Sequence, residues 1–230
     1  MEEKLFEYNP QTHTGTYKGK PLASVTQLVS VLYPLDTSIP QDRLESAAKR
    51  GTDIHDKVCE INKLFDNPYP FEENLKRAIL KAKELGGRDL LDYVFFLSAY
   101  GLKPFDYENL VFVLDASGEP ICYGHYDLVV IATKDITVDG VDLFKEGLLY
   151  LIDLKTVSEF DKLKTSFQCS AYKIGYEQMS KNLVEKTYGL HLREGIKLKP
   201  LFQEEKEQTI RLLSSAKKMW ELQQWHWAWF

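Results

Sequence analysis

The chain has little cysteine, no long apolar run and no low-complexity tract, and each absence excludes a class of protein. Its three cysteines, Cys59, Cys122 and Cys169, are far apart and form no Cys-x-x-Cys pair. This argues for reduced thiols and against a zinc or iron–sulfur site. No apolar run reaches the roughly 18 residues that a membrane helix needs, and the charged start, residues 1–4, is unlike a secretory signal. We therefore expect a cytoplasmic protein with no membrane partner.

The chain also has fewer basic than acidic residues, 29 Lys and Arg against 34 Asp and Glu. The 230 residues carry a formal net charge of −5, which does not by itself indicate a nucleic-acid binder. The charge is uneven, because residues 1–152 hold 16 Lys and Arg against 24 Asp and Glu, whereas residues 153–218 hold 13 against 9. A basic face results only if those side chains gather in space. With an ordinary composition, no repeat and no linker, we expect one domain over residues 1–230.

Turn residues and apolar periodicity predict a mostly helical N-terminal part, residues 1–105. A hairpin of residues 6–8 and 14–17 precedes a helix that Ser24 or Thr26 caps and that Pro34 and Pro40 end. Residues 41 to about 64 form a helix with an apolar stripe, and residues 72–85 and 88–100 form two more. The stripe consists of Leu44, Ala47, Ala48, Gly51, Ile54, Val58 and Ile61, and His55 lies on or beside it.

Strand-like patterns replace helical ones over residues 106–202, the predicted sheet core. Strands over 108–114 and 121–132 flank a hairpin turn, and residues 134–147 form a loop or a small excursion. A helix follows over 166 to about 185, then a hairpin of 188–193 and 196–201. Residues 203–230 comprise a helix over 204–224 and an aromatic tail. The expected fold class is α/β, with a mixed central β-sheet flanked by helices and a helical N-terminal part.

One more strand, residues 148–156, ends in an acid and a base. Leu148 to Ile152 is an apolar and aromatic run, typical of a strand that is buried on both faces. Because side chains alternate along a strand, Asp153 and Lys155 project from one face and Leu154 from the other. Taken alone the pair predicts a surface ion pair, since buried charges are costly unless they are paired or bind a metal.

Other polar residues converge on this strand in the expected fold. Asp127 precedes the apolar run of a neighbouring strand, and Glu108 starts the strand that pairs with it. His55 lies on a half-buried helical face, and Gln168 and Tyr172 share one face of the following helix. Each residue alone also has a plain structural reading, such as a core histidine, a strand-end cap or an amphipathic helix face. Their joint occurrence in this order favours a site.

As a set, these residues suit metal-assisted hydrolysis of a phosphodiester. Carboxylates and a backbone carbonyl supply the oxygen ligands that hard divalent cations need, and an imidazole favours Mn²⁺ while leaving Mg²⁺ workable. A bound cation lowers the pKa of its water, and Lys155 would orient that water or stabilise developing charge. The predicted metal ligands are His55, Asp127, Asp153 and the backbone carbonyl of Leu154, with Glu108 as a further candidate.

The motifs Arg-Gly-Thr-x-x-His, Gly-x-x-Asp, Asp-x-Lys-Thr and Gln-x-x-x-Tyr, in this order, resemble those of the PD-(D/E)XK nucleases. They are similar to the RecB-like branch, which includes phage and mitochondrial genome-maintenance exonucleases, and residues 23–27 also resemble that branch. The resemblance covers about residues 20–180. It implies a restriction-endonuclease-like fold and a Mg²⁺- or Mn²⁺-dependent DNA exonuclease of recombination, repair or replication, in a bacterial or phage-infected cell.

The resemblance also implies roles for single residues. Lys155 would be the catalytic lysine, acting with Asp127 and Asp153, and Gln168 and Tyr172 would form an accessory motif that positions a DNA phosphate or nucleotide. Some relatives hold an iron–sulfur cluster with four cysteines, which this chain cannot build, and no helicase portion is present. The predicted catalytic residues are Lys155, Asp153, Asp127, Gln168 and Tyr172, and the predicted DNA contacts are Arg50, Thr52, Thr156, Gln168 and Tyr172.

Alternatives remain for the activity and for the C-terminal tail. The chain could instead be a structure-specific or restriction-like endonuclease, or a DNA- or partner-binding module that lost activity. The tail is expected to dock on its own domain or on a second copy of the chain. Its other candidate roles are base stacking with single-stranded DNA and anchoring a recombination or replication partner. The tail's aromatic residues are Trp220, Trp225, Trp227, Trp229 and Phe230.

Overall fold

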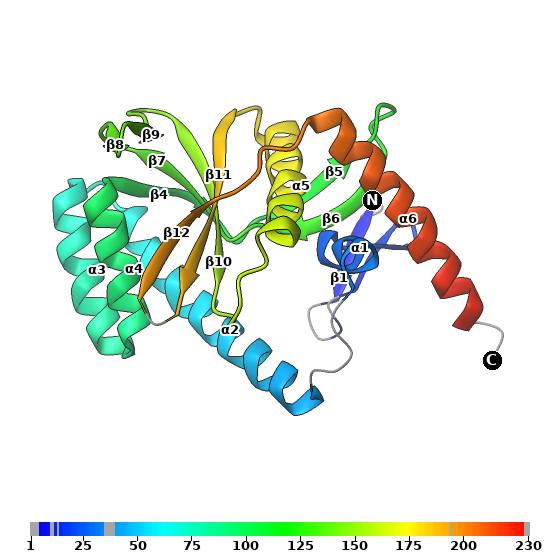
Figure 1. Cartoon of the computed structure of the whole chain (residues 1–230), viewed down its shortest axis with the longest axis horizontal. Coiled ribbons are helices and arrows are strands. Elements are labelled where there is room, and N and C mark those ends of the chain that lie inside the picture. The colour runs from blue at the N-terminus through cyan, green and yellow to red at the C-terminus, as the bar shows by residue number, and fades with distance from the viewer. Residues whose placement is uncertain (1–4, 10–11, 13, 35–39, 194, 228–230) are drawn as a thin grey trace.

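A computed structural model describes residues 5–9, 12, 14–34, 40–193 and 195–227, with side chains up to residue 224. Five of its strands form a mixed sheet in the order β12–β11–β10–β7–β4 (Figure 1). In this sheet β10 and β11 are parallel, and the other neighbours are antiparallel. The strands are β4 (Leu102–Tyr107), β7 (Leu128–Ala132), β10 (Leu149–Lys155), β11 (Val184–Leu192) and β12 (Ile196–Pro200).

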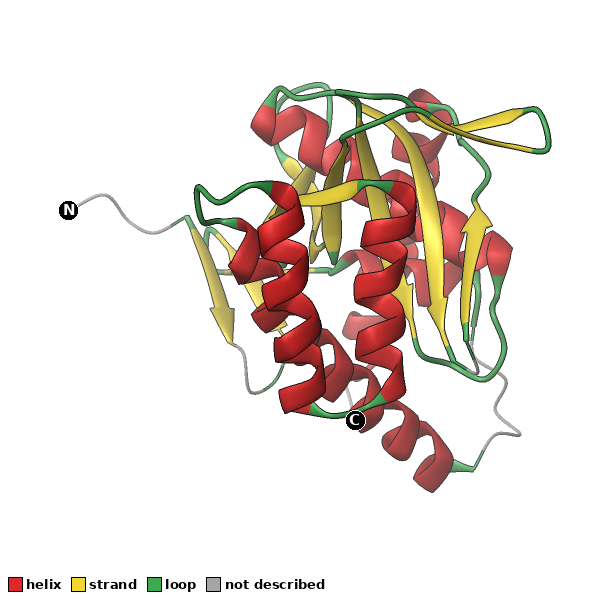
Figure 2. Cartoon of the chain, turned by 90° about the vertical axis from the view of Figure 1, so that its left-hand side faces the viewer, coloured by secondary structure: helices red, strands yellow, loops and turns green. Residues whose placement is uncertain are grey.

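Helices cover both faces of this sheet, which confirms the expected α/β class. On one face pack α2 (Gln41–Asn62), the 3₁₀ turn Lys63–Phe65, α3 (Phe71–Leu85) and α4 (Arg88–Tyr100). Figure 2 shows α3 and α4 side by side in front of the sheet. On the other face pack α1 (Val25–Leu32), α5 (Lys162–Ser180) and α6 (Lys206–Trp227).

Within the described residues, three smaller sheets flank the central one. The N-terminal hairpin β1 (Phe6–Asn9) and β2 (Thr14–Tyr17) is confirmed, and β3 (Lys20–Leu22) adds a third strand that the sequence did not predict. A two-stranded sheet of β5 (Leu110–Leu114) and β6 (Pro120–His125) packs under α5. Residues 134–147 hold a small hairpin of β8 (Ile136–Val138) and β9 (Val141–Phe144).

Strand β10 lies at the centre and is buried on both faces, as its apolar run predicted. Tyr150, Ile152 and Leu154 join the core under α2–α4, whereas Leu149 and Leu151 face the core under α5. Complete burial of a side chain of this size stabilises a fold by about 1.5–3 kcal/mol. The packing therefore fixes the end of β10, where Asp153 and Lys155 lie.

Local chemistry at Ser24, Pro40 and Pro70 accompanies the starts of the first three helices. Ser24 caps α1, because its Oγ accepts a hydrogen bond from the Gln27 N–H at 3.2 Å while Gln27 Oε1 accepts one from the Ser24 N–H at 2.8 Å. Helix α2 begins directly after Pro40, and α3 begins after Pro70. The boundary at Pro34 lies next to residues 35–39, which are outside the described residues.

Several predicted boundaries are wrong. The strand expected over 121–132 is two strands, β6 and β7, which belong to different sheets and meet at Tyr126 and Asp127. The strand expected to start at Glu108 begins at Leu110, and β4 was not predicted.

The helix expected over 166–185 runs over 162–180, because Lys181 adopts a left-handed conformation with φ 64° and ends it. Strand β11 consequently begins at Val184, and the last helix is displaced by two residues at its start.

The predicted apolar stripe of α2 is buried only in its second half. Ile54, Val58 and Ile61 are buried in the core, as expected. Ala47 and Ala48 are exposed instead, because the first half of α2 extends beyond the sheet (Figure 1). In the first half of α2, small residues at helical spacing therefore do not indicate a buried face.

A buried hydrogen bond between α2 and α4 provides a stability test. The Tyr93 hydroxyl donates to Asn62 Oδ1 at 2.6 Å, and both residues are buried. Tyr93→Phe leaves that oxygen without its donor, so we expect a loss of about 1–3 kcal/mol in the free energy of unfolding. Each kcal/mol corresponds to about 2–4 °C in melting temperature for a chain of this size. Thermal unfolding followed by circular dichroism measures the change.

The matched control is Tyr107→Phe. The Tyr107 hydroxyl also donates to an oxygen at 2.6 Å, but its acceptor, Asp66, is near the surface where water replaces the lost partner. We expect a smaller loss there. Equal losses in the two variants would contradict the importance that we assign to burial.

Candidate metal centre and its neighbouring lysine

Pairing of β7 with β10 brings the two predicted aspartates to the same end of the sheet. Leu128 of β7 lies opposite Ile152 of β10, so Asp127 reaches the neighbourhood of Leu154. The Leu154 N–H donates to Asp127 Oδ2 at 2.6 Å. A backbone hydrogen bond therefore orients the Asp127 carboxylate. Sequence reasoning missed this partner, since only the register of the two strands reveals it.

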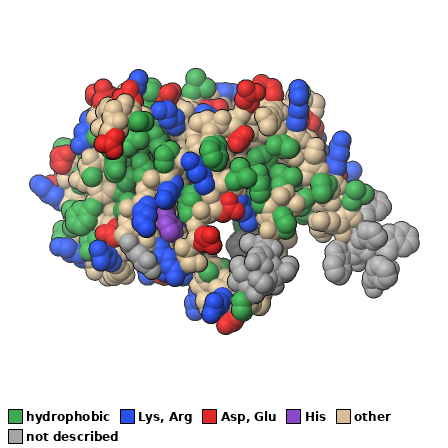
Figure 3. Space-filling model, in the orientation of Figure 1, with side chains coloured by type: hydrophobic (Ala, Val, Ile, Leu, Met, Phe, Trp, Pro, Cys, Tyr) green, Lys and Arg blue, Asp and Glu red, His purple; other side chains and the backbone are tan. Residues whose placement is uncertain are grey.

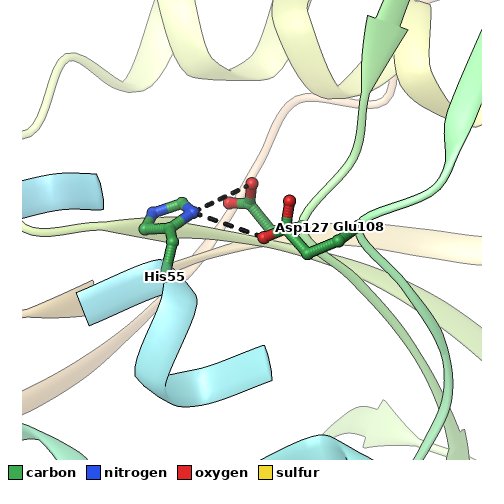
Figure 4. Close-up of side chains that lie close together, drawn as sticks. All are labelled: His55, Glu108 and Asp127. Carbon is green, nitrogen blue, oxygen red and sulfur yellow. Dashed lines mark ion pairs between the residues drawn. The ribbon is translucent and has the colours of Figure 1, made fainter. Parts of the chain in front are cut away.

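A histidine and two carboxylates form a compact cluster at this point (Figure 4). His55 Nδ1 lies 3.4 Å from Asp127 Oδ1 and 3.6 Å from Glu108 Oε1. One ligand atom of each residue lies within 4.8 Å of those of the other two. His55 comes from α2, Asp127 from the junction of β6 and β7, and Glu108 from the junction of β4 and β5. The cluster thus joins three segments that are remote in the sequence.

Glu108 reaches the cluster through an uncommon backbone conformation. It has φ 52°, in the left-handed region where residues other than glycine are infrequent. Its N–H donates to the carbonyl of Asp127 at 3.2 Å, which ties the β4–β5 junction to the β6–β7 junction. The sequence placed Glu108 at the start of a strand, whereas it lies in the turn between two. Strained residues are frequent at functional sites, which is consistent with a ligand role.

The carbonyl of Leu154, predicted as a metal ligand, contacts His55 in this structure. His55 Nε2 lies 3.2 Å from that oxygen. Because a carbonyl only accepts, the proton must be on Nε2, and Nδ1 then presents its lone pair or a second proton to the carboxylates. Such a backbone contact to the far ring nitrogen is what usually orients a metal-binding histidine. Leu154 thereby contributes to the site through both of its backbone groups.

Asp153 lies beside the cluster and pairs with the predicted catalytic lysine. Asp153 Oδ2 lies 2.7 Å from Lys155 Nζ, and the Asp153 side chain is almost fully buried. Lys155 Nζ also donates to Gln168 Oε1 at 3.3 Å, and Gln168 Nε2 donates to the Tyr172 hydroxyl at 3.0 Å. The four residues form one chain of contacts from β10 to α5. Asp153 does not belong to the three-residue cluster, so its role as a ligand stays a prediction.

The charges in the site shift one another's pKa. The Asp127 carboxylate raises the pKa of His55 to about 11, with Glu108 adding to this and burial opposing it. Burial would raise the pKa of Asp127, but the charges of His55 and Lys155 hold it below its ordinary value. Burial raises the pKa of Asp153 to about 6, against the effect of Lys155. Burial lowers the pKa of Lys155, but Asp153 and Asp127 raise it above its ordinary value, so the ammonium stays charged at neutral pH.

The donor set of the cluster fits a divalent cation. Two carboxylates and one imidazole match the ligands of Mn²⁺ and are workable for Mg²⁺. Ligand atoms at neighbouring corners of an octahedron with bonds of about 2.1 Å lie about 3 Å apart. The 3.4 and 3.6 Å separations of the cluster are close to that value. When a cation binds, it would take the place of the proton between His55 Nδ1 and the two carboxylates. That proton would then be released.

The remaining predicted DNA contacts lie around α2. Arg50 pairs with Asp89 of α4, with its guanidinium 2.8 Å from the carboxylate. Thr52 is exposed, and its hydroxyl donates to the Ala48 carbonyl. Thr156 is buried next to Gly51, where α2 crosses the end of β10. Arg50 and Thr156 are therefore engaged within the protein, and contact with DNA remains a prediction for all three.

Basic side chains gather near the outer edge of the sheet. Figure 3 shows Lys and Arg side chains together over the region of β11 and β12. Lys197 and Lys199 of β12 lie opposite His191 and Gly189 of β11, and Arg193 follows that strand. Within the part of the chain that the structure describes, none of these three basic residues forms a salt bridge. The uneven charge of the sequence thus produces a local basic surface.

The aromatic tail is described only in part. Trp220 of α6 packs against the core under α5, as the docking prediction expected for one of its members. The side chains of Trp225 and Trp227, and the residues Trp229 and Phe230, lie outside the described residues.

The three cysteines form no disulfide with one another. Cys59, Cys122 and Cys169 are separate free thiols.

No protein-family model and no curated protein matches this chain. Among the helices of the described residues, none combines the length and apolar character needed to cross a membrane.

Proposed function

We propose that this chain is a metal-dependent DNA nuclease with a restriction-endonuclease-like fold, acting as an exonuclease in recombination, repair or replication. One observation carries the proposal. His55, Glu108 and Asp127 converge beside Lys155, and a backbone hydrogen bond from Leu154 joins the two parts. A cluster that would hold a cation, next to a charged lysine, suits phosphodiester hydrolysis, because both the water and the phosphate need activation.

The residues of the chain have distinct tasks in this proposal. A bound Mg²⁺ or Mn²⁺ would supply an acidic water and neutralise phosphate charge. His55, Glu108 and Asp127 would hold the cation, with Asp153 as a further ligand. Lys155, positioned by Asp153 and Gln168, would stabilise the negative charge that develops on the phosphate. The ammonium is charged at neutral pH, which favours this electrostatic role over that of a general base.

Degradation of labelled DNA tests the proposal. We expect linear single-stranded or double-stranded DNA to be shortened from its ends in Mg²⁺ or Mn²⁺, and to stay intact when a chelator is present. Circular DNA of the same sequence separates the two nuclease classes, since an exonuclease leaves it intact and an endonuclease opens it. If linear and circular DNA both remain intact in Mg²⁺ and also in Mn²⁺, the chain is not a DNA nuclease. DNA binding without cleavage would then identify a silent binding module.

A further inference from the structure

Helix α6 has two apolar sides, and only one of them is buried. The inner side packs on α1, α5 and β6. On the outer side Leu212, Met219 and Leu222 face solvent, with exposed fractions that rise along the helix from 39% to 50% and 67%. The residues of the inner side are Thr209, Leu213, Ala216 and Trp220.

The second half of α6 extends beyond the elements on which the helix packs (Figure 1). Among the described side chains of α6, Trp220 is the last that packs against the core under α5, and residues 221–224 are all exposed. Most of the stability of a helix in a protein comes from burial of an apolar face against other elements. A partner that covers the outer side would supply such burial to the exposed half of α6.

The exposed apolar residues follow the spacing of a coiled coil. Leu212 and Met219 are seven residues apart and Leu222 comes three residues later, as two a positions and one d position of a heptad repeat. A strip confined to a and d positions is the narrow seam that pairs with another helix, whereas a wider stripe packs on a globular core. The geometry of the outer side therefore suits a helix as its partner.

The same repeat runs through the whole of α6 without a charged residue. Its positions within the helix form what we call the α6 seam, and those with described side chains are all exposed. By sequence, Trp229 has the next d position, although it lies outside the described residues. The residues of the α6 seam are Gln208, Leu212, Ser215, Met219, Leu222 and His226.

The charges beside the seam are compatible with a second copy of the same helix in parallel. On one side of the seam, at g positions, lie Arg211 and Lys218. In a parallel pair each of them faces the e position of the next heptad of the other helix. Arg211 would then face the partner's Ala216, and Lys218 the partner's Gln223. No like charges meet in this arrangement.

An antiparallel pair of the same helices would be less favourable. If the stretches from Leu212 to Leu222 overlapped in opposite directions, the two copies of Lys218 would meet near the centre of the pair. Two ammonium groups repel each other, and nearby acids do not face them, because Glu221 lies on another side of the helix. The parallel arrangement also places every seam residue against its own copy, as in an isologous interface.

We propose that the outer side of α6 is a dimerisation surface, on which α6 of a second copy packs in parallel as a short two-stranded coiled coil. The seam contains two polar residues, Gln208 and Ser215, between its apolar ones, and it is short. Small interfaces of this kind form reversible complexes, so we expect monomer and dimer in equilibrium. The candidate metal cluster and Lys155 contain no residue of α6, and the inference does not depend on the proposed nuclease function.

Sedimentation velocity over a range of protein concentrations, without DNA or metal, tests the inference. The wild type should shift from monomer to dimer as its concentration rises. Leu222→Ala removes an apolar contact twice in a symmetric dimer, so we expect the dissociation constant to rise at least about tenfold. The matched control is Leu80→Ala on α3, because Leu80 is 66% exposed and Leu222 is 67% exposed. Leu80→Ala should dimerise as the wild type does.

A disulfide between two copies tests the direction of the helices. In the parallel pair the two side chains at position 222 face each other, so Leu222→Cys should form a disulfide-linked dimer under mild oxidation. The wild type, in which Cys122 and Cys169 are buried, and Leu80→Cys should remain unlinked. A mixture of Leu212→Cys and Leu222→Cys chains should link like with like, whereas an antiparallel pair would link the two variants to each other.

Two results would overturn the dimerisation surface. The first is a wild type that stays monomeric at every concentration, which would leave the α6 seam to some other partner. The second is a dimer that forms equally well in Leu222→Ala, which would place the interface elsewhere. Mixed linkage of Leu212→Cys with Leu222→Cys would overturn the parallel arrangement. Cleavage of DNA has no part in these measurements, so their failure leaves the nuclease proposal unaffected.

Discussion

Lys155→Ala is expected to lower the rate of DNA cleavage by about a hundredfold to a thousandfold, the usual loss when one stabilising group is removed from a transition state. The ammonium of Lys155 lies 2.7 Å from Asp153 and 3.3 Å from Gln168, so it has little freedom to move. Its neighbouring carboxylates hold its pKa above the ordinary value. In the proposed mechanism it would therefore offer a fixed positive charge to a phosphate. Single-turnover cleavage of an end-labelled strand in Mn²⁺ measures the effect.

Two controls separate the proposed catalytic role of Lys155 from a structural one. Removal of Lys155 leaves Asp153 buried without its cation, which itself destabilises the fold. Gln168→Ala keeps the ion pair and removes only a positioning contact, so we expect a smaller loss, about tenfold, with little change in melting temperature. Lys145→Ala, at a surface lysine that pairs with Asp142, should leave cleavage unchanged. If Lys155→Ala cleaves as fast as the wild type, the site has been assigned wrongly.

Asp127→Asn is expected to weaken Mn²⁺ binding by more than about a hundredfold, beyond the 10–100-fold typical for a residue that only supports a ligand. Asparagine keeps a carbonyl oxygen that accepts from the Leu154 N–H, but it loses the charge that faces His55. Cleavage should fall with it. Mn²⁺ titration followed by electron paramagnetic resonance measures the affinity directly.

Comparison with Asp127→Ala separates folding from metal binding at the same position. Alanine also removes the acceptor of the buried Leu154 N–H, at a cost of about 1–3 kcal/mol in the free energy of unfolding. In chelator we therefore expect Asp127→Ala to melt at a lower temperature than Asp127→Asn. Asp115→Asn, at an exposed turn, serves as the control for loss of one carboxylate. Tight Mn²⁺ binding by Asp127→Asn would place the ligands elsewhere.

Elements whose signals are local could be predicted from the sequence. The helices 71–85 and 88–100 follow from apolar periodicity and from Gly86 and Gly87 between them. The break at Tyr126 and Asp127 could not be predicted, because the run from Ile121 to Ala132 is apolar on both sides of it. Which sheet each half joins depends on remote partners. Strand β4 was missed because Pro104 and its polar neighbours conceal an edge strand, where a missing N–H is tolerated.

The site was predictable as a set of residue types but not as an arrangement. The order of the motifs predicted that His55, Asp127, Asp153 and Lys155 lie together. The structure brings these four residues to one end of the sheet, where His55 contacts Asp127 and Lys155 contacts Asp153. The approach of Glu108 to His55 depends on a left-handed turn that a glutamate rarely adopts. The engagement of Arg50 by Asp89 depends on the packing of α2 against α4, which no local pattern encodes.

Leu154 has a consequence for how sequence variation acts on the site. It orients Asp127 with its N–H and His55 with its C=O, while its side chain is buried in the core under α2. Every residue except proline offers both backbone groups, so position 154 should tolerate any apolar side chain that fits the core. Asp153 and Lys155, on either side, should tolerate almost none. Replacement of Leu154 by another apolar residue should therefore leave the positions of the proposed ligands unchanged. In a saturation scan across 153–155, substitutions should be tolerated at position 154 but not at positions 153 and 155.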